Sequence, residues 1–173
     1  IGTSSPVPFA YQIHKQDAAY FLTMTAVEWV EVLSRREAKQ LICDSLNHCI
    51  EQKGLEVFAY VIMSNHLHLV VRARQGNLSD IAAILEDTSG ALIRMLRQPG
   101  ESRREWLVPL LEKGGNRQKK KSRHQLWQYN NHAEVVFSRS FTRIKINYIH
   151  QNPVEAGLVD RATNYIFSSA RDY

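Results

Sequence analysis

The sequence has little cysteine and no long run of apolar residues. Its two cysteines, Cys43 and Cys49, lie six positions apart in a predicted helix and point in different directions, so we expect two reduced packing residues. There is no Cys-x-x-Cys pair and no Cys/His spacing typical of zinc. No stretch approaches the ~18 apolar residues of a membrane span, and the first residues lack a charged region followed by an apolar run. We therefore expect a soluble, cytoplasmic protein with no membrane partner.

The composition is that of an ordinary globular protein. Hydrophobic residues make up 44% of the sequence and charged residues 23%, which excludes a mostly disordered or collagen-like chain. At ~150 residues per domain, the length of 173 residues predicts one domain over 1–173. A domain of this size buries about 68–70% of the surface of its unfolded chain, so it can form a core without disulfides or a structural metal.

The net charge of +5 is unevenly distributed. Between Arg94 and His124 there are ten Lys or Arg residues and only three Glu, and the densest part is the run 117–124 after Gly114 and Gly115. A basic run after flexible glycines is typical of a loop that follows phosphates, and equally of a solvated linker. We interpret 99–124 as a basic insertion with a short helix at about 103–112.

The first part of the sequence predicts a strand, a helix and a hairpin. Residues 20–25 are β-prone, and 35–53 carry apolar positions at the three-and-four spacing of a helix with one buried face. Gly54 is a suitable stop for that helix. Strands are predicted at 55–63 and 67–73, and the short connection between them favours a tight antiparallel hairpin.

The rest of the sequence completes an α+β pattern. Asn77 is a plausible N-cap for a helix over 78–97, a further strand is predicted at 125–130, and a last helix at 139–151 should end near Pro153. The order β-α-β-β-α-β followed by a helix predicts a ferredoxin-like, split βαβ fold. Its four-stranded antiparallel sheet has helices on one face, plus a C-terminal helix.

Two histidines directly after the hairpin turn are the sharpest chemical signal. Side chains two apart on a strand project to the same face, so His66 and His68 can aim at one ion while Leu67 enters the core. A bare His-x-His pair is a common accident, and two ordinary strand histidines are the alternative. The hairpin and the apolar strand that follows would hold this pair rigidly.

A second signal lies on the last helix. Tyr148 and Asn152 are four residues apart and share a helix face. A tyrosine there is usually a packing residue. With a two-histidine metal site, the phenol can instead be a nucleophile, because a divalent ion held by two imidazoles and the Asn152 carbonyl oxygen polarises a phosphodiester and stabilises the leaving 3′ oxygen.

Both signals together resemble the HUH single-tyrosine transposases, and within them the REP-associated tyrosine transposases. The resemblance covers nearly the whole chain outside 99–124. It rests on four blocks: Tyr20-Phe-Leu-Thr; Val61-Ile-Met-Ser-Asn-His66-Leu-His68-Leu-Val; Tyr148-Ile-His-Gln-Asn152-Pro-Val-Glu-Ala-Gly-Leu-Val159; and Tyr165-Ile-Phe-Ser-Ser-Ala.

The resemblance implies a DNA strand transferase. His66 and His68 would be the metal ligands of the HUH motif, Asn152 would be the third protein ligand, and the metal would be Mg²⁺ or Mn²⁺. Tyr148 would attack single-stranded DNA and leave a 5′-phosphotyrosine link and a free 3′-OH. Members of this family act on hairpin-bearing single-stranded DNA, and many work as dimers. No nucleotide cofactor is expected, because the phosphotyrosine conserves the energy of the broken bond and the sequence has no Gly-x-x-x-x-Gly-Lys loop.

DNA binding would combine basic side chains with aromatic stacking. Lys145 and its neighbours lie closest to the nucleophile in sequence, although each cation alone is more often an ordinary solvated charge. The candidates are Arg72, Arg74, Lys119, Lys120, Lys121, Arg123, Arg139, Arg143 and Lys145.

Three other functions fit parts of the pattern. The histidine-triad hydrolases need a third histidine where this sequence has Val70. RNA-binding domains of the same topology need exposed aromatics on the central strands, which Phe58 and Tyr60 supply only in part. The third is a catalytically silent, domesticated relative that binds hairpin DNA without cutting it.

Overall fold

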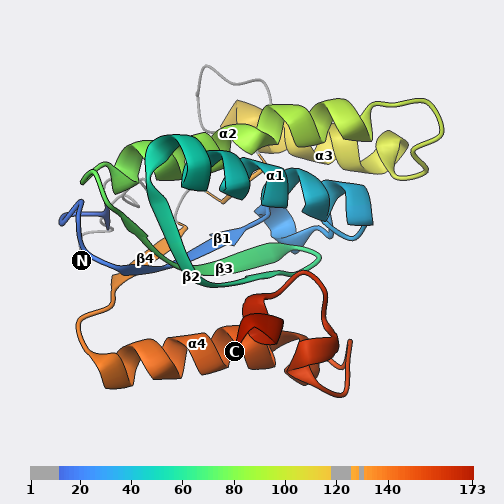
Figure 1. Ribbon diagram of the computed structural model, residues 1–173. Helices are drawn as coiled ribbons and strands as arrows, with labels where there is room; N and C mark the ends of the chain where they lie inside the picture. The colour runs from blue at the N-terminus through green and yellow to red at the C-terminus, as the bar shows by residue number, and fades with distance from the viewer. Residues whose placement is uncertain (1–11, 118–125, 129–130) are drawn as a thin grey trace, which may run out of the picture.

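The computed structural model describes residues 12–117, 126–128 and 131–173 (Figure 1). The helices and strands follow the predicted order. They are β1 (Tyr20–Thr25), α1 (Arg36–Lys53), β2 (Leu55–Ile62), β3 (His66–Ala73), α2 (Leu78–Leu96), α3 (Arg104–Arg117), β4 (His132–Val135) and α4 (Arg139–Glu155), with short 3₁₀ turns η2 (Val27–Trp29), η3 (Ala162–Asn164) and η4 (Ser169–Asp172).

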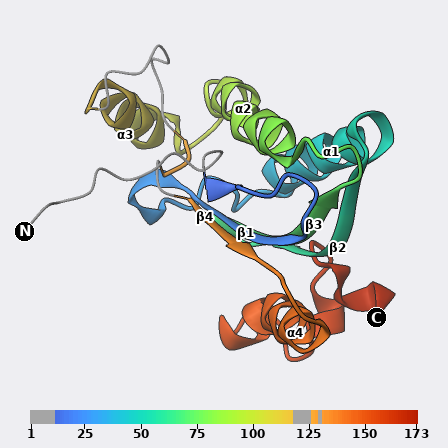
Figure 2. The same cartoon turned by 90° about the vertical axis from the view of Figure 1, so that its left-hand side faces the viewer.

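The four strands form one antiparallel sheet in the order β2-β3-β1-β4. Helices α1 and α2 cover one face of this sheet, and α4 lies across the other (Figures 1 and 2). The predicted split βαβ fold with an additional C-terminal helix is therefore confirmed. No helix in the part of the chain that the structure describes is long and apolar enough to cross a membrane.

Strand alternation divides the apolar residues between two cores. Leu22 on β1 and Leu69 on β3 are fully buried in the larger core, which faces α1 and α2. Phe21 and Val70, their neighbours along the same strands, lie in a smaller core with Ile149 of α4. Because successive strand residues face opposite sides, every second residue of β1 and β3 is on the sheet face that α4 covers.

The fourth strand lies later in the chain than predicted. The prediction at 125–130 is wrong, because β4 is His132–Val135. Within the described part of the earlier segment, Trp127 makes only an isolated bridge to Ala26. Leu126 and Trp127 are buried in the larger core, so the apolar pattern that favoured a strand reflects burial and not ladder pairing.

Asn131 bridges the gap between this segment and β4. Its side-chain Oδ1 accepts the backbone N–H of Thr25 at 2.9 Å, in the place of a ladder bond. The residue is 3% exposed. An unsatisfied buried donor costs about 1–3 kcal/mol, but the substitution also removes the buried, unpartnered Nδ2 of Asn131, so Asn131→Ala should lower the free energy of unfolding by about 1 kcal/mol in a urea titration. The exposed Asn164→Ala is the control, and equal stability of the two variants would contradict this role.

Helix α4 continues through Pro153 and does not end before it. It runs to Glu155 and stops in a Schellman motif, in which Leu158 N donates to Pro153 O and Gly157 N donates to Val154 O, both at 2.9 Å. Gly157 has φ of +70°, a conformation that favours glycine. The proline rule predicted the end too early, and the glycine four residues later is the actual stop signal. Asn152 therefore lies inside the helix.

The predicted N-cap at Asn77 and the predicted short helix in 99–124 also differ in detail from the structure. Asn77 stands at the start of α2, but its side chain makes no capping bond. Instead, Gln16 Oε1 accepts the Ser79 backbone N–H at 2.8 Å. Helix α3 begins where the short helix was predicted and extends to Arg117, through the two glycines. The basic residues 118–124 lie outside the described residues.

Candidate active site between the sheet and helix α4

His66 and His68 lie on the sheet face that α4 covers, as their spacing predicts. Leu67 and Leu69 enter the larger core on the other side. The two imidazole rings are 4.8 Å apart between centroids. His68 is 5% exposed and stacks on Phe21, at 5.3 Å. The pair is therefore held rigidly by a buried strand.

Helix α4 brings Tyr148 and Asn152 to the two histidines. His66 Nε2 lies 3.2 Å from Asn152 Oδ1, and the Tyr148 ring lies 5.2 Å from the His68 ring. Tyr148 is 44% exposed, so its hydroxyl is open to a large ligand. All four residues line one open pocket of about 510 Å³. The structure thus joins two motifs that are about eighty residues apart in the sequence.

Hydrogen bonds to neighbouring polar groups orient both imidazoles. Asn65 Nδ2 donates to the Trp29 carbonyl at 3.2 Å, which turns its Oδ1 toward His66 Nδ1, 2.7 Å away. His66 Nδ1 must then donate, and the lone pair of its Nε2 faces Asn152. His68 Nδ1 lies 2.8 Å from Thr23 Oγ1. When Nδ1 donates to this hydroxyl, the Nε2 of His68 is also left for a ligand.

The donor atoms fit a divalent cation. The Nε2 of His66 and the Oδ1 of Asn152 are both acceptors in this arrangement and lie 3.2 Å apart. These residues, with His68, would hold a divalent cation, which would act there as a Lewis acid. Among the residues that the structure describes, no group of three His, Cys, Asp or Glu could hold a metal. A metal here would therefore depend on the Asn152 oxygen in addition to the histidines.

Burial favours the neutral form of both histidines. It lowers the pKa of His68 to about 3, and the charges of His66 and Lys145 act in the same direction. Burial also lowers the pKa of His66, although the Asn152 oxygen, which accepts from the protonated ring, opposes this shift. Neutral imidazole is the form that ligates a metal, so neither side chain must lose a proton near pH 7 before it can bind one.

Lys145 is the basic candidate that the structure puts in the pocket. Its Nζ lies 2.7 Å from Glu134 Oε2 and over the rings of Phe21 and Phe141, at 4.5 and 5.0 Å. The bond from Lys145 lowers the pKa of Glu134. Lys145 is one turn of α4 before Tyr148, so it is positioned to contact a phosphate that reaches the phenol, with Glu134 as its partner in the free protein.

Among the other basic candidates, the four that the structure describes do not line this pocket. Arg72 donates to Glu56 at 2.7 Å, and Arg74 lies 3.7 Å from the same carboxylate. Arg139 and Arg143 are exposed on α4. The remaining four candidates lie outside the described residues: Lys119, Lys120, Lys121 and Arg123. A DNA-binding role for these residues stays a prediction.

Sequence reasoning missed several residues that line the pocket or orient its histidines. Strand alternation could have found Thr23, which follows Phe21 on the same face of β1, and the hairpin motif already contained Asn65. Glu134 and His132 could not be found, because the fourth strand was predicted too early. Trp29 had no local signal. The side chains that line the pocket are Thr23, Thr25, Trp29, His132 and Glu134, whereas Asn65 orients His66 from outside this lining.

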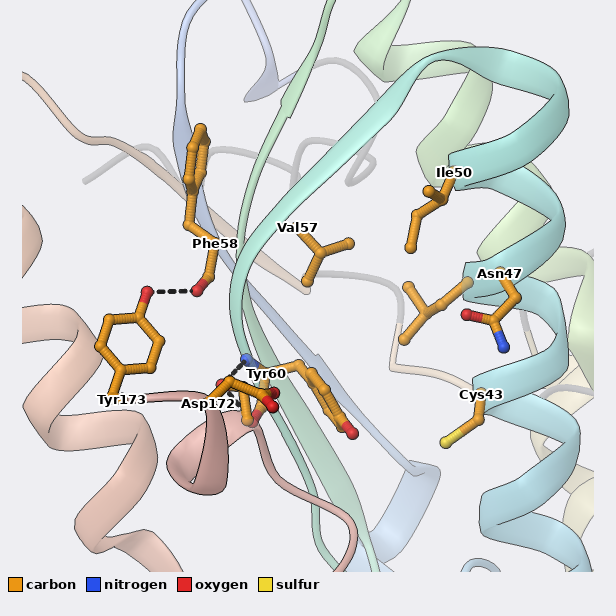
Figure 3. Close-up of a pocket in the computed structure, with 10 residues that line it drawn as sticks. Cys43, Asn47, Ile50, Val57, Phe58, Tyr60, Asp172 and Tyr173 are labelled. Atoms are coloured by element: carbon orange, nitrogen blue, oxygen red, sulfur yellow. Dashed lines mark hydrogen bonds between the residues drawn. The ribbon is translucent and has the colours of Figure 1, made fainter.

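A second pocket of about 300 Å³ lies elsewhere, between α1, β2 and the C-terminal residues (Figure 3). Ile50, Val57 and Phe58 give it an apolar wall. The Tyr173 hydroxyl donates to the Phe58 carbonyl, so the C-terminal residues lie against β2 here. None of the predicted catalytic or metal-binding residues lines this pocket.

Comparisons with known proteins extend the fold assignment. No family model and no curated protein matches the sequence. Among solved structures, the chain is similar to a REP-associated tyrosine transposase bound to a REP hairpin, with a TM-score of 0.61 and 13% identity over 99% of this chain and 83% of the other. It also matches a protein from Deinococcus radiodurans R1 described as a transposase, with a TM-score of 0.44 and 21% identity over 87% and 94%. The similarity to the first of these structures confirms, for the fold, the resemblance predicted from the sequence.

Proposed function

We propose that this protein is a metal-dependent strand transferase for single-stranded DNA, which cuts and rejoins DNA through a phosphotyrosine at Tyr148. One observation carries this proposal. A half-exposed phenol lies beside two histidines and an amide oxygen in one open pocket. The similarity of this fold to that of a REP-associated tyrosine transposase supports the same interpretation.

The proposed reaction has two steps, cleavage of the strand and its rejoining. Tyr148 Oη attacks the phosphorus of a phosphodiester, the bond from phosphorus to the 3′ oxygen breaks, and the phenol releases its proton to solvent. The 3′ oxygen leaves and takes up a proton from solvent, which gives a free 3′-OH. The reverse attack by a 3′-OH rejoins the strand and returns the proton to Tyr148. Each step exchanges one phosphate ester for another, so no nucleotide is consumed.

The pocket supplies the electrostatics for this attack. His66, His68 and Asn152 would hold a Mg²⁺ or Mn²⁺ ion, which when bound polarises the phosphate and stabilises the leaving oxygen. When the substrate binds, Lys145 releases the Glu134 carboxylate and donates to a phosphate oxygen instead. The packed rings of Phe21 and His68 fix the direction from which Tyr148 approaches.

Hairpin-bearing DNA is the substrate class that we propose. The structurally similar transposase is bound to a REP hairpin, and the basic stretch between Arg94 and His124 offers charge for phosphate contacts outside the pocket. The alternative is a silent module that binds hairpin DNA or RNA. Helix α4 covers the sheet face of Phe21 and Val70, so base stacking on an open sheet has little room there.

A denaturing-gel assay tests the reaction class. The protein is mixed with Mn²⁺ or Mg²⁺ and a labelled pool of single-stranded DNA hairpins, with matched RNA hairpins and a chelator in parallel lanes. We expect a slowly migrating, denaturant-resistant band with DNA and metal, and none with chelator. Hairpin binding without any such band, for a pool that includes the native recognition sequence, would favour the silent module.

A further inference from the structure

An exposed tryptophan stands beside the candidate catalytic residues with no role in the chemistry above. Trp29 ends the short η2 turn directly after β1 and is 62% exposed. It lines the same pocket as Tyr148, His66 and Asn152. An indole is the largest apolar side chain, and burial would normally be its most favourable state. Its exposure inside the candidate site, beside Tyr148, leaves the ring available to a ligand of that site.

The backbone at Trp29 is strained. Glu28 and Trp29 have φ of +52° and +55°, and they are the described non-glycine residues with positive φ. This left-handed conformation is unfavourable for side chains with a Cβ, and bulky residues adopt it only where the surrounding structure enforces it. Glycine would adopt it freely. The turn thus retains a bulky aromatic where glycine would be easier to accommodate.

Asn65 connects this turn to the metal-binding histidine. Its backbone carbonyl accepts the Ala26 N–H at 2.8 Å, and its side chain donates to the Trp29 carbonyl at 3.2 Å. The same side chain accepts from His66 Nδ1. One residue therefore fixes both the orientation of His66 and the backbone of Trp29, so the point from which the indole projects is defined relative to the reacting groups.

We infer that Trp29 is a stacking platform for an unpaired base next to the phosphate that Tyr148 attacks. The inference rests on the proposed function and adds a positioning residue to it. Aromatic side chains bind single strands by stacking on bases, without a strong sequence preference because every base has a flat π-face. Lys145 and Tyr148 contact the sugar-phosphate backbone of the DNA while the Trp29 ring stacks on the base. Together these contacts set which phosphate lies at Tyr148.

Single-strand affinity tests the platform without any cleavage. The protein carries Tyr148→Phe to prevent covalent chemistry, and the probe is a labelled twelve-nucleotide oligothymidylate without a hairpin. Trp29→Ala should weaken binding about tenfold, and Trp29→Phe should retain most of the affinity. The control is Trp106→Ala, an exposed tryptophan of α3 outside the pocket, which should bind like the parent. Equal affinities of the Trp29→Ala and Trp106→Ala variants would overturn the inference.

Two further measurements separate stacking from a structural role. Trp29→Gly should melt no lower than the parent protein, because glycine relieves the strained φ, yet it should bind as weakly as Trp29→Ala. A clear fall in melting temperature would instead identify Trp29 as a structural anchor. The second measurement is the rate of adduct formation with Tyr148 intact, on an adduct-forming hairpin. Replacing the nucleotide beside the cleaved bond with an abasic one should slow this rate for the wild type and leave it unchanged for Trp29→Ala. If the abasic nucleotide slows adduct formation by Trp29→Ala as much as by the wild type, Trp29 is not a stacking platform. Absence of any adduct with the wild type would refute only the proposed function.

Discussion

Tyr148→Phe is expected to abolish the covalent protein–DNA adduct and leave DNA binding almost unchanged. The substitution removes one hydroxyl, and with it the atom that attacks phosphorus. The ring still packs edge-on against His68 and Phe21, so the pocket keeps its shape. We expect adduct formation to fall at least about a thousandfold, with the hairpin dissociation constant within roughly threefold. Denaturing gels measure the first quantity and fluorescence anisotropy the second.

Tyr173→Phe is the matched control for this experiment. Tyr173 is another exposed tyrosine, at 71%, and its hydroxyl donates to the carbonyl of Phe58 at the second pocket. Its loss should not affect adduct formation. Persistent adduct in the Tyr148→Phe protein would identify a different nucleophile, and an adduct lost equally in both variants would point to a general effect on folding.

The sequence predicted the two halves of the site because each depends on a local periodicity. His66 and His68 share a face by strand alternation, and Tyr148 and Asn152 share one by helical spacing. Their meeting depends on which sheet face α4 covers, and no local pattern encodes this. The proximity of the two halves was inferred from the family resemblance. The structure provides the contact itself, the 3.2 Å approach of Asn152 to His66.

The residues that support the site were harder to predict. Thr23 and Asn65 are common residue types whose significance depends on the partner across the strand or turn. Glu134 faces Lys145 only because β4 begins at His132, and burial of Leu126 and Trp127 mimicked an earlier strand. The proline rule ended α4 too soon, because packing and the Gly157 motif outweighed a local preference. For Thr23, Glu134 and the buried segment 126–127, a contact between residues far apart in the sequence decided the outcome.

The second large effect concerns the histidines. For the wild type, Mn²⁺ at roughly a hundred times its dissociation constant should stabilise the native state by about 2.7 kcal/mol, a shift of several degrees in melting temperature for a chain of this length. His66→Ala removes the Nε2 that faces Asn152, so it should lose most of this shift. We expect its metal-dependent adduct rate to fall by two to three orders of magnitude, on the order expected for a lost catalytic metal. Calorimetry with and without Mn²⁺ provides a readout that does not depend on DNA.

His68→Ala should give the same loss of metal response together with a lower melting temperature in the absence of metal. His68 is buried and stacked on Phe21, so its truncation also leaves a cavity in the smaller core. Comparison with His66→Ala separates the two effects, because His66 is less buried. The exposed His48 of α1 lies on the opposite side of the sheet, and His48→Ala should retain both the Mn²⁺ shift and the adduct. An unchanged Mn²⁺ response in both site variants would exclude this pair as metal ligands, and an adduct that still required metal would then depend on a cation bound elsewhere.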